Sequence, residues 1–320
     1  MYYFDALKNR GKVKKGVDIV ETNTILNTPR PPLPPPPLSI VSTVDLNPVK
    51  VDIPKHMNEL YVNKEITEET LKAINIIVDE IYERDPNQIS YVKRLAEFRG
   101  LDPQPLLDNK CFLSPNPEYI EGLYRELNLY RRIYHISSAT NTLWKDRLIT
   151  PVRDFKGSVY GFVGYSAYSN TKYVEYSSPV YKKTTIKALG LDRLDKVLES
   201  GYCIFTEGNF DYFRGIQHDL SIVANIGIKF NPLLKPLIDK LDVVFTAYDN
   251  DKTGIKNMNM IDNLHPNVYH IRFNKIMKND KEVKGDLDEA LKDLDKVEKL
   301  KVEINQRLKF KTCRLPHIKI

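Results

Sequence analysis

The sequence predicts an α/β protein in which a parallel sheet flanked by helices follows a mixed α+β lobe. From about residue 196 onward, short apolar runs alternate with helical patterns, which is typical of strands joined by crossover helices. Upstream of these, three helical patterns precede two β-rich runs that a turn separates. The predicted parts are an arm (1–50), an N-terminal lobe (51–195), a sheet domain (196–285) and a C-terminal helix with a basic tail (286–320).

The composition is that of a globular protein without a membrane partner. Charged residues make up 28% of the chain, and no apolar run approaches the roughly 20 residues that a spanning helix needs. The N-terminus has no signal-peptide pattern, so we expect a cytoplasmic protein. Cys111, Cys203 and Cys313 form no CxxC pair, which predicts that no zinc is bound and fits a reducing compartment. The net charge of +6 is compatible with nucleic acid but does not require it.

The first 50 residues have the composition of a disordered arm. A basic cluster at 8–15 is followed by a proline-rich run at 29–37. Proline has a fixed φ and no N–H, so this run predicts extended polyproline II. It can act as a stiff spacer or as a docking segment for an aromatic groove, and the sequence leaves both open.

The N-terminal lobe is expected to begin with helices and to end with a hairpin. The apolar spacing predicts helices over 67–81, 88–98 and 119–130, with a cap at Thr67 and a helix end near Gly100. Two β-rich runs, 147–152 and 158–164, flank a turn of Asp-Phe-Lys-Gly.

We expect the functional groups of the sheet domain to lie at one edge of the sheet. The pattern predicts strands at 202–206, 220–224, 243–248 and 268–272, and helices at 194–199, 210–217, 233–241, 255–264 and 287–300. In parallel sheets the functional groups lie beyond the carboxyl ends of the strands.

Acidic residues follow these predicted strands in pairs. The members are Glu207 and Asp211, Asp249 and Asp251, and Asp286 and Asp288. Such carboxylates would repel one another if they converged, and a Mg²⁺ or Mn²⁺ ion held with a phosphate would relieve that repulsion. Gly208 would let a phosphate approach the backbone. The alternative for Asp251 and Asp288 is that each caps the following helix.

Asp249 to Thr253 also fits the DxDxT nucleophile motif of haloacid-dehalogenase-type phosphotransferases. That fold needs a longer segment after the motif than remains here, and an apolar strand followed by Glu-Gly precedes it. These two features favour the metal site.

At this point the sequence resembles a known family. Glu-Gly-Asn-Phe-Asp (207–211) and Asp-Asn-Asp (249–251) are similar to the EGxxD and DxD motifs of the TOPRIM domain of topoisomerases, primases and some nucleases. Upstream, residues 147–164 resemble the RPIRDxxG…GFxGR block of bacterial-type and phage DNA primases. Smaller matches to the same primases lie at 98–101 (RGL), 172–175 (KYLN), 181–183 (FHK), 189–191 (YGL) and 285–289 (DPDE).

The resemblance implies a DNA primase core that copies single-stranded DNA into short RNA from NTPs. Glu207, Asp249 and Asp251 would be catalytic and hold Mg²⁺ or Mn²⁺, with Asp286 and Asp288 nearby and Asp211 and Gly208 in support. Nucleotide or template contacts would come from basic and aromatic residues of the N-terminal lobe: Arg99, Arg147, Arg153, Lys172, Tyr173 and Lys183. Tyr160, Tyr165 and Tyr168 could stack on bases or belong to the core.

This chain departs from the family pattern in two positions and in its extent. Tyr165 stands where the family has Arg, and Glu175 where it has Asn. The family's zinc-binding and helicase domains are not found in the sequence, so the resemblance implies a separate zinc-binding module and a replicative helicase as partners. A bacteriophage origin would place the protein in the host cytoplasm. The alternatives are a TOPRIM nuclease and a non-catalytic single-strand-binding adaptor.

Overall fold

The computed structural model describes most of the chain from residue 64 onward. The described ranges are 64–114, 117–126, 146–167, 169, 171–177, 188–226, 230–249, 251–273, 276–278, 281–283, 285–310 and 317–319. All of them belong to the second of two units, 51–320, and the predicted arm of 1–50 lies outside them. Among the helices in these ranges, none combines the length and the apolar character of a membrane span.

Helices open the described part of the chain. They are α3 (Lys64–Arg84), α4 (Asn87–Arg99), α5 (Gln104–Asp108) and α6 (Pro117–Glu126). α3 begins three residues before Thr67, so the predicted cap at Thr67 is wrong: that residue lies inside the first turn. α4 ends as predicted, because Gly100 takes a left-handed conformation with φ of 64° that closes the helix.

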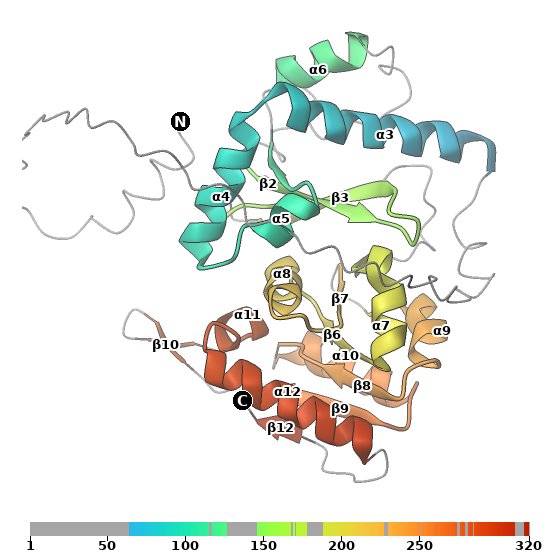
Figure 1. Ribbon diagram of the computed structural model, residues 1–320, viewed down its shortest axis with the longest axis vertical. Coiled ribbons are helices and arrows are strands. Elements are labelled where there is room, and N and C mark those ends of the chain that lie inside the picture. The colour runs from blue at the N-terminus through green and yellow to red at the C-terminus, as the bar shows by residue number, and fades with distance from the viewer. Residues whose placement is uncertain are drawn as a thin grey trace, which may run out of the picture. The chain divides into compact units, whose positions relative to one another are not determined.

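A four-stranded antiparallel sheet follows, in the order β1-β2-β3-β4. Its strands are β1 (Phe112–Leu113), β2 (Leu148–Arg153), β3 (Val159–Tyr165) and β4 (Tyr173–Ser177). The predicted hairpin is confirmed: Asp154 accepts hydrogen bonds from the Lys156 and Ser158 amides, both at 2.9 Å, and Gly157 adopts φ of 79°. α3 packs on this sheet (Figure 1), where Ile74 and Val78 meet Phe112 and Phe162.

The predicted parallel sheet is confirmed as a six-stranded sheet in the order β12-β9-β8-β6-β7-β5. The strands are β5 (Ala188–Leu189), β6 (Tyr202–Thr206), β7 (Ile222–Asn225), β8 (Val243–Thr246), β9 (Val268–Arg272) and β12 (His317–Lys319). All neighbours are parallel except β5, which runs antiparallel to β7. The sheet therefore takes β5 and β12 from outside the predicted range of 196–285.

Helices connect and cover these strands (Figure 1). They are η2 (Leu191–Arg193), α7 (Leu194–Ser200), α8 (Asn209–Gln217), η3 (Pro232–Leu234), α9 (Lys235–Ile238), α10 (Lys252–Asp262), α11 (Leu287–Ala290) and α12 (Leu294–Lys309), with a small hairpin of β10 (Ile276–Lys278) and β11 (Lys281–Val283). The predicted helix of 287–300 is in fact two helices, because Asp293 caps a new start by accepting from the Asp295 amide. The helix expected at 233–241 is also shorter, with prolines at its start.

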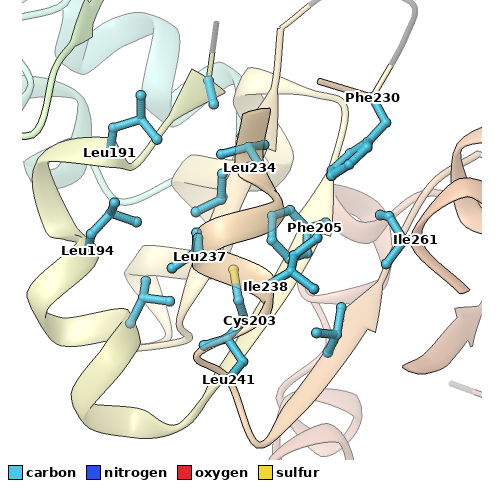
Figure 2. Close-up of a cluster of buried hydrophobic side chains, with 14 of the residues drawn as sticks. Leu191, Leu194, Cys203, Phe205, Phe230, Leu234, Leu237, Ile238, Leu241 and Ile261 are labelled. Atoms are coloured by element: carbon cyan, nitrogen blue, oxygen red, sulfur yellow. The ribbon is translucent and has the colours of Figure 1, made fainter. Parts of the chain in front are cut away.

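One apolar core holds the six-stranded sheet in place. Figure 2 shows Cys203 and Phe205 of β6 packed among Phe230, Ile238 and Ile261 from the covering segments, all of them almost fully buried. Truncating a buried Phe to Ala typically costs about 3–5 kcal/mol. The core thus fixes β6, and with it the position at which the chain leaves the sheet beyond Thr206.

Candidate functional site

Carboxylates from three separate segments line one pocket of about 490 Å³ at the carboxyl ends of β6 and β8. Glu207 follows β6, Asp249 follows β8, Asp211 lies in α8 and Asp286 precedes α11. Since β6 and β8 are parallel neighbours, their carboxyl ends meet at the same edge of the sheet. The other lining residues are Val163, Tyr173, Gly208, Asn209, Ala224 and Ile226.

Glu207 and Asp249 are linked directly. The amide of Asp249 donates to Oε1 of Glu207 over 3.0 Å, so the turn after β8 is tied to the side chain after β6. Partial burial raises the pKa of the Glu207 carboxyl, and the negative charges of Asp249 and Asp251 raise it further. A cation entering the pocket would therefore be favoured electrostatically.

Asp211 is a buried acid in the wall of the pocket. Its Oδ2 accepts hydrogen bonds from the Thr206 hydroxyl (3.0 Å) and the Gly208 amide (3.2 Å), and its Oδ1 accepts one from the Asp288 amide (2.8 Å). Burial, together with the charge of Asp286, raises the pKa of the Asp211 carboxyl to about 8. A side chain at position 208 would meet this carboxylate, because a Cβ there would lie 2.5 Å from Asp211 Oδ2.

Asp251 does not line the pocket. It is exposed and caps α10, with Oδ1 accepting from the amides of Thr253 and Gly254 at 2.9 Å each. This is the capping role left open by the sequence. Gly254 makes the turn possible, since a Cβ there would lie 1.9 Å from the carbonyl oxygen of Asp249.

Asp286 and Asp288 have different surroundings although they are two residues apart. Asp286 lines the pocket and caps α11, accepting from the Glu289 amide over 2.8 Å. Asp288 is 3% exposed and forms ion pairs with Arg99 and Arg214. The cap of α11 is therefore Asp286 rather than Asp288, and both oxygens of Asp288 are already paired.

The donor chemistry of the pocket fits a divalent cation. Glu207, Asp249 and Asp286 offer carboxylate oxygens, which Mg²⁺ prefers together with phosphate oxygens and water. Burial is the main reason that the pKa values of Glu207 and Asp211 are raised, and the charges of neighbouring acids raise them further. Across the described residues, no three His, Cys, Asp or Glu side chains already stand close enough to form a metal cluster. Ligation by three of these carboxylates would thus require their side chains to move.

Two arginines that the motifs assign to template contact form hydrogen bonds within the chain. Arg147, 2% exposed, donates to the carbonyls of Lys172 and Thr171 and to the Ser169 hydroxyl at 2.9–3.0 Å. Arg153 donates to the Gly157 carbonyl over 2.8 Å and to Asn109. The expected nucleic-acid contacts of Arg147 and Arg153 stay predictions, and in the structure the donors of both side chains hold loops in place.

Arg99 lies in an aromatic and acidic setting rather than on an open surface. Its guanidinium carbon stands 4.2 Å from the centre of the Phe210 ring, and it pairs with Asp288. Tyr165, which replaces the family's Arg, packs against Phe210 with ring centres 4.7 Å apart and is 8% exposed. Tyr160 is likewise buried, so both tyrosines belong to the core.

Lys172 and Tyr173 remain available for contact. Both are exposed, and Tyr173 lines the pocket while its ring packs at a tilt against Tyr165, with ring centres 5.2 Å apart. Lys183 and Tyr168 lie outside the described residues. Sequence reasoning missed Arg214, which is 1% exposed; an arginine inside the apolar run of α8 was the available signal.

Solved structures of bacterial primases share this fold. The zinc-binding and RNA polymerase domains of the Aquifex aeolicus primase match with a TM-score of 0.58 and 25% identity, over 76% of this chain and 62% of that one. The Escherichia coli primase catalytic core matches with a TM-score of 0.54 and 15% identity, over 76% and 82% of the two chains. A DnaG primase catalytic domain bound to single-stranded DNA matches with a TM-score of 0.54 and 16% identity, over 79% and 80%.

No protein-family profile and no curated protein matches the chain. The chain spans less than two thirds of the Aquifex aeolicus chain, which carries a zinc-binding domain as well. Its fold is that of the catalytic core of bacterial DnaG-type primases, as the sequence motifs implied.

Proposed function

We propose that this chain is the catalytic core of a DNA primase, a nucleotidyltransferase that makes short RNA primers on single-stranded DNA from NTPs. The observation that carries the proposal is the shared pocket: Glu207 and Asp249 lie at the carboxyl ends of neighbouring parallel strands in a primase fold. One solved neighbour of this fold is bound to single-stranded DNA, which supports the template as a partner.

The roles proposed for the residues follow from their positions. Glu207, Asp249 and Asp286 would hold Mg²⁺ or Mn²⁺, which when bound lowers the barrier by polarising the α-phosphate and activating the primer 3′-hydroxyl. Asp251 would act through the cap that it forms on α10. Lys172 would neutralise backbone phosphate, and the exposed ring of Tyr173 would stack on a base at the pocket wall.

Asp211 and Gly208 have supporting roles in this proposal. Asp211 holds the Gly208 amide and the end of β6 in a fixed geometry. The absence of a side chain at Gly208 lets a phosphate approach that turn. The proposed partners beyond the template and NTPs are a zinc-binding module and a replicative helicase in the bacterial cytoplasm, as the resemblance implies.

The test is primer synthesis by the full chain. Purified protein is incubated with single-stranded DNA, labelled NTPs and Mg²⁺, with and without an added helicase and zinc-binding module. We expect labelled oligoribonucleotides from the wild type and none from Glu207→Gln, with Glu298→Gln on the exposed face of α12 as the matched control. Products that appear without NTPs through cleavage of labelled DNA would instead indicate a nuclease, and the absence of both would leave a binding adaptor.

A further inference from the structure

Asp288 sits where two guanidinium groups meet. Its Oδ1 accepts from Arg214 Nε over 2.9 Å, and its Oδ2 accepts from Arg99 Nη2. The side chains of Asp288 and Arg214 are 4% and 2% exposed. A carboxylate with both oxygens paired in this way has its charge balanced by the protein and offers little to a cation.

Arg214 also donates hydrogen bonds to the C-terminal end of α4. Its Nη1 donates to the carbonyl of Gly100, and its Nη2 donates to the carbonyl of Arg99 over 3.1 Å. These carbonyls have no partner within their own helix, and a cation at a helix C-terminus is favourable. Arg99, from that same helix end, supplies the second guanidinium on Asp288.

The backbone of Asp288 continues this connection toward the pocket. Its amide donates to Asp211 Oδ1 over 2.8 Å, and Asp211 Oδ2 in turn accepts from the Gly208 amide, next to Glu207. α11 and α8 pack side by side here (Figure 1). A continuous chain of hydrogen bonds thus runs from the end of α4 to the turn that carries Glu207.

We propose that Asp288 is a positioning residue and not a metal ligand: held by Arg99 and Arg214, it fixes Asp211 beneath the turn that presents Glu207. Asp286 is then the acid of this segment that faces the pocket, which its place in the lining supports. The inference rests on the proposed function for its catalytic consequence, whereas its structural part stands on the contacts alone.

The experiment compares Asp288→Asn with Asp286→Asn in the full chain. Mn²⁺ binding is followed by the EPR signal of free Mn²⁺, and stability by thermal unfolding. We expect Asp288→Asn to lower Tm by about 6 °C or more, since it removes the carboxylate that pairs with the buried Arg214 and with Arg99, and to keep the Kd for Mn²⁺ within about twofold. Asp286→Asn should weaken Mn²⁺ about tenfold or more and change Tm little.

Arg214→Gln and the double variant Asp288→Asn/Arg214→Gln complete a double-mutant cycle. The double variant should lose less stability than the sum of the two single losses, because both changes break the Arg214–Asp288 pair, although each also removes contacts of its own. Arg99→Lys, at a partly exposed position, provides a milder change that should lower Tm without affecting Mn²⁺ if the larger changes prevent folding. A tenfold loss of Mn²⁺ affinity in Asp288→Asn, or additive losses of stability in the cycle, would overturn the proposal.

The catalytic part has a separate readout. At a temperature well below the Tm of each variant and at saturating metal, Asp288→Asn should lower kcat for primer synthesis about tenfold with KM for NTP unchanged. A purely structural role would leave kcat intact under these conditions, and that result would remove the positioning claim. If the wild type makes no primer, the proposed function fails, while the Mn²⁺ and stability results still decide whether Asp288 is a ligand.

Discussion

In the antiparallel sheet of β1–β4 two arginines donate to the protein's own backbone, whereas in the parallel sheet carboxylates line a pocket. In the first, Arg147 and Arg153 donate to carbonyls of their own loops. In the second, Glu207 and Asp249 stand beyond parallel strand ends and line a pocket, where burial and the neighbouring acidic charges raise the pKa of the Glu207 carboxyl. The comparison teaches that the place of a charged motif residue, at a pocket or within a loop, decides whether it can meet a ligand.

The largest effect should come from removing charge at the pocket. Glu207→Gln should reduce primer synthesis about 1,000-fold, since charge stabilisation by a bound metal is worth several kcal/mol. The fold should not suffer, because the pKa of the Glu207 carboxyl is raised and its ionised form is therefore disfavoured. Activity assays and thermal unfolding check both statements. Equal activity of Glu207→Gln and wild type would mean that this edge of the sheet is not catalytic.

Gly254→Ala tests the turn that carries Asp249. The added Cβ would lie 1.9 Å from the Asp249 carbonyl oxygen, so the turn must shift, and we expect a loss of about 3 kcal/mol together with weaker Mn²⁺ binding. Gly122→Ala in α6 is the matched control, because a Cβ there meets nothing within 4 Å. Urea unfolding of both variants gives the comparison, and equal stability would show that the close approach is absent in solution.

Arg147→Met tests whether the arginine of the antiparallel sheet stabilises the fold. Loss of the guanidinium removes the donor to the Thr171 carbonyl and leaves the Lys172 carbonyl with the Ser166 amide alone, which should cost about 2 kcal/mol in the free energy of unfolding. The exposed Lys93→Met is the control for lost charge. If Arg147→Met unfolds like the wild type but binds single-stranded DNA much more weakly, Arg147 contacts the template, as the motif implies.

Asp211 should make stability depend on pH. Its pKa is raised from 3.8 to about 8, so between these values the folded state keeps a proton that the unfolded state has lost. The free energy of unfolding should therefore fall as pH rises from about 5 to 8, by about 1 kcal/mol per pH unit relative to Asp211→Asn. Denaturant unfolding at several pH values in metal-free buffer measures the slope. Parallel slopes for the two proteins would show that the carboxyl is ionised throughout.

The smallest effect concerns the exposed cation of the antiparallel sheet. Lys172→Ala should weaken single-stranded DNA binding by severalfold and lower the slope of log Kd against log salt by about one. Its stability should not change. Lys301→Ala on α12 is the control and should leave both quantities unaltered. Fluorescence anisotropy at several salt concentrations distinguishes the two.

The sequence predicted the parallel sheet and the acidic edge because both depend on local patterns. The apolar runs around Phe205 and Phe245 are almost fully buried strands, and the acids that follow them share an edge by topology. The sequence did not predict that Arg147 would be buried against the Lys172 carbonyl or that Arg153 would donate to Asn109, since these partners lie in distant loops. For the same reason Asp286 and Asp288 look alike in sequence. They differ in the folded protein because only Asp288 forms ion pairs with Arg99 and Arg214.

The short strand β12 has a consequence for handling the protein. It pairs in parallel with β9, from His317 beside His270 to Lys319 beside Arg272, and is itself the outermost strand on that side of the sheet. A sheet edge left bare is a template for adding strands from other molecules, and a short edge strand offers less of one. Shortening the chain before His317 would expose the five-residue edge of β9 in place of the three-residue edge of β12, and should therefore favour self-association.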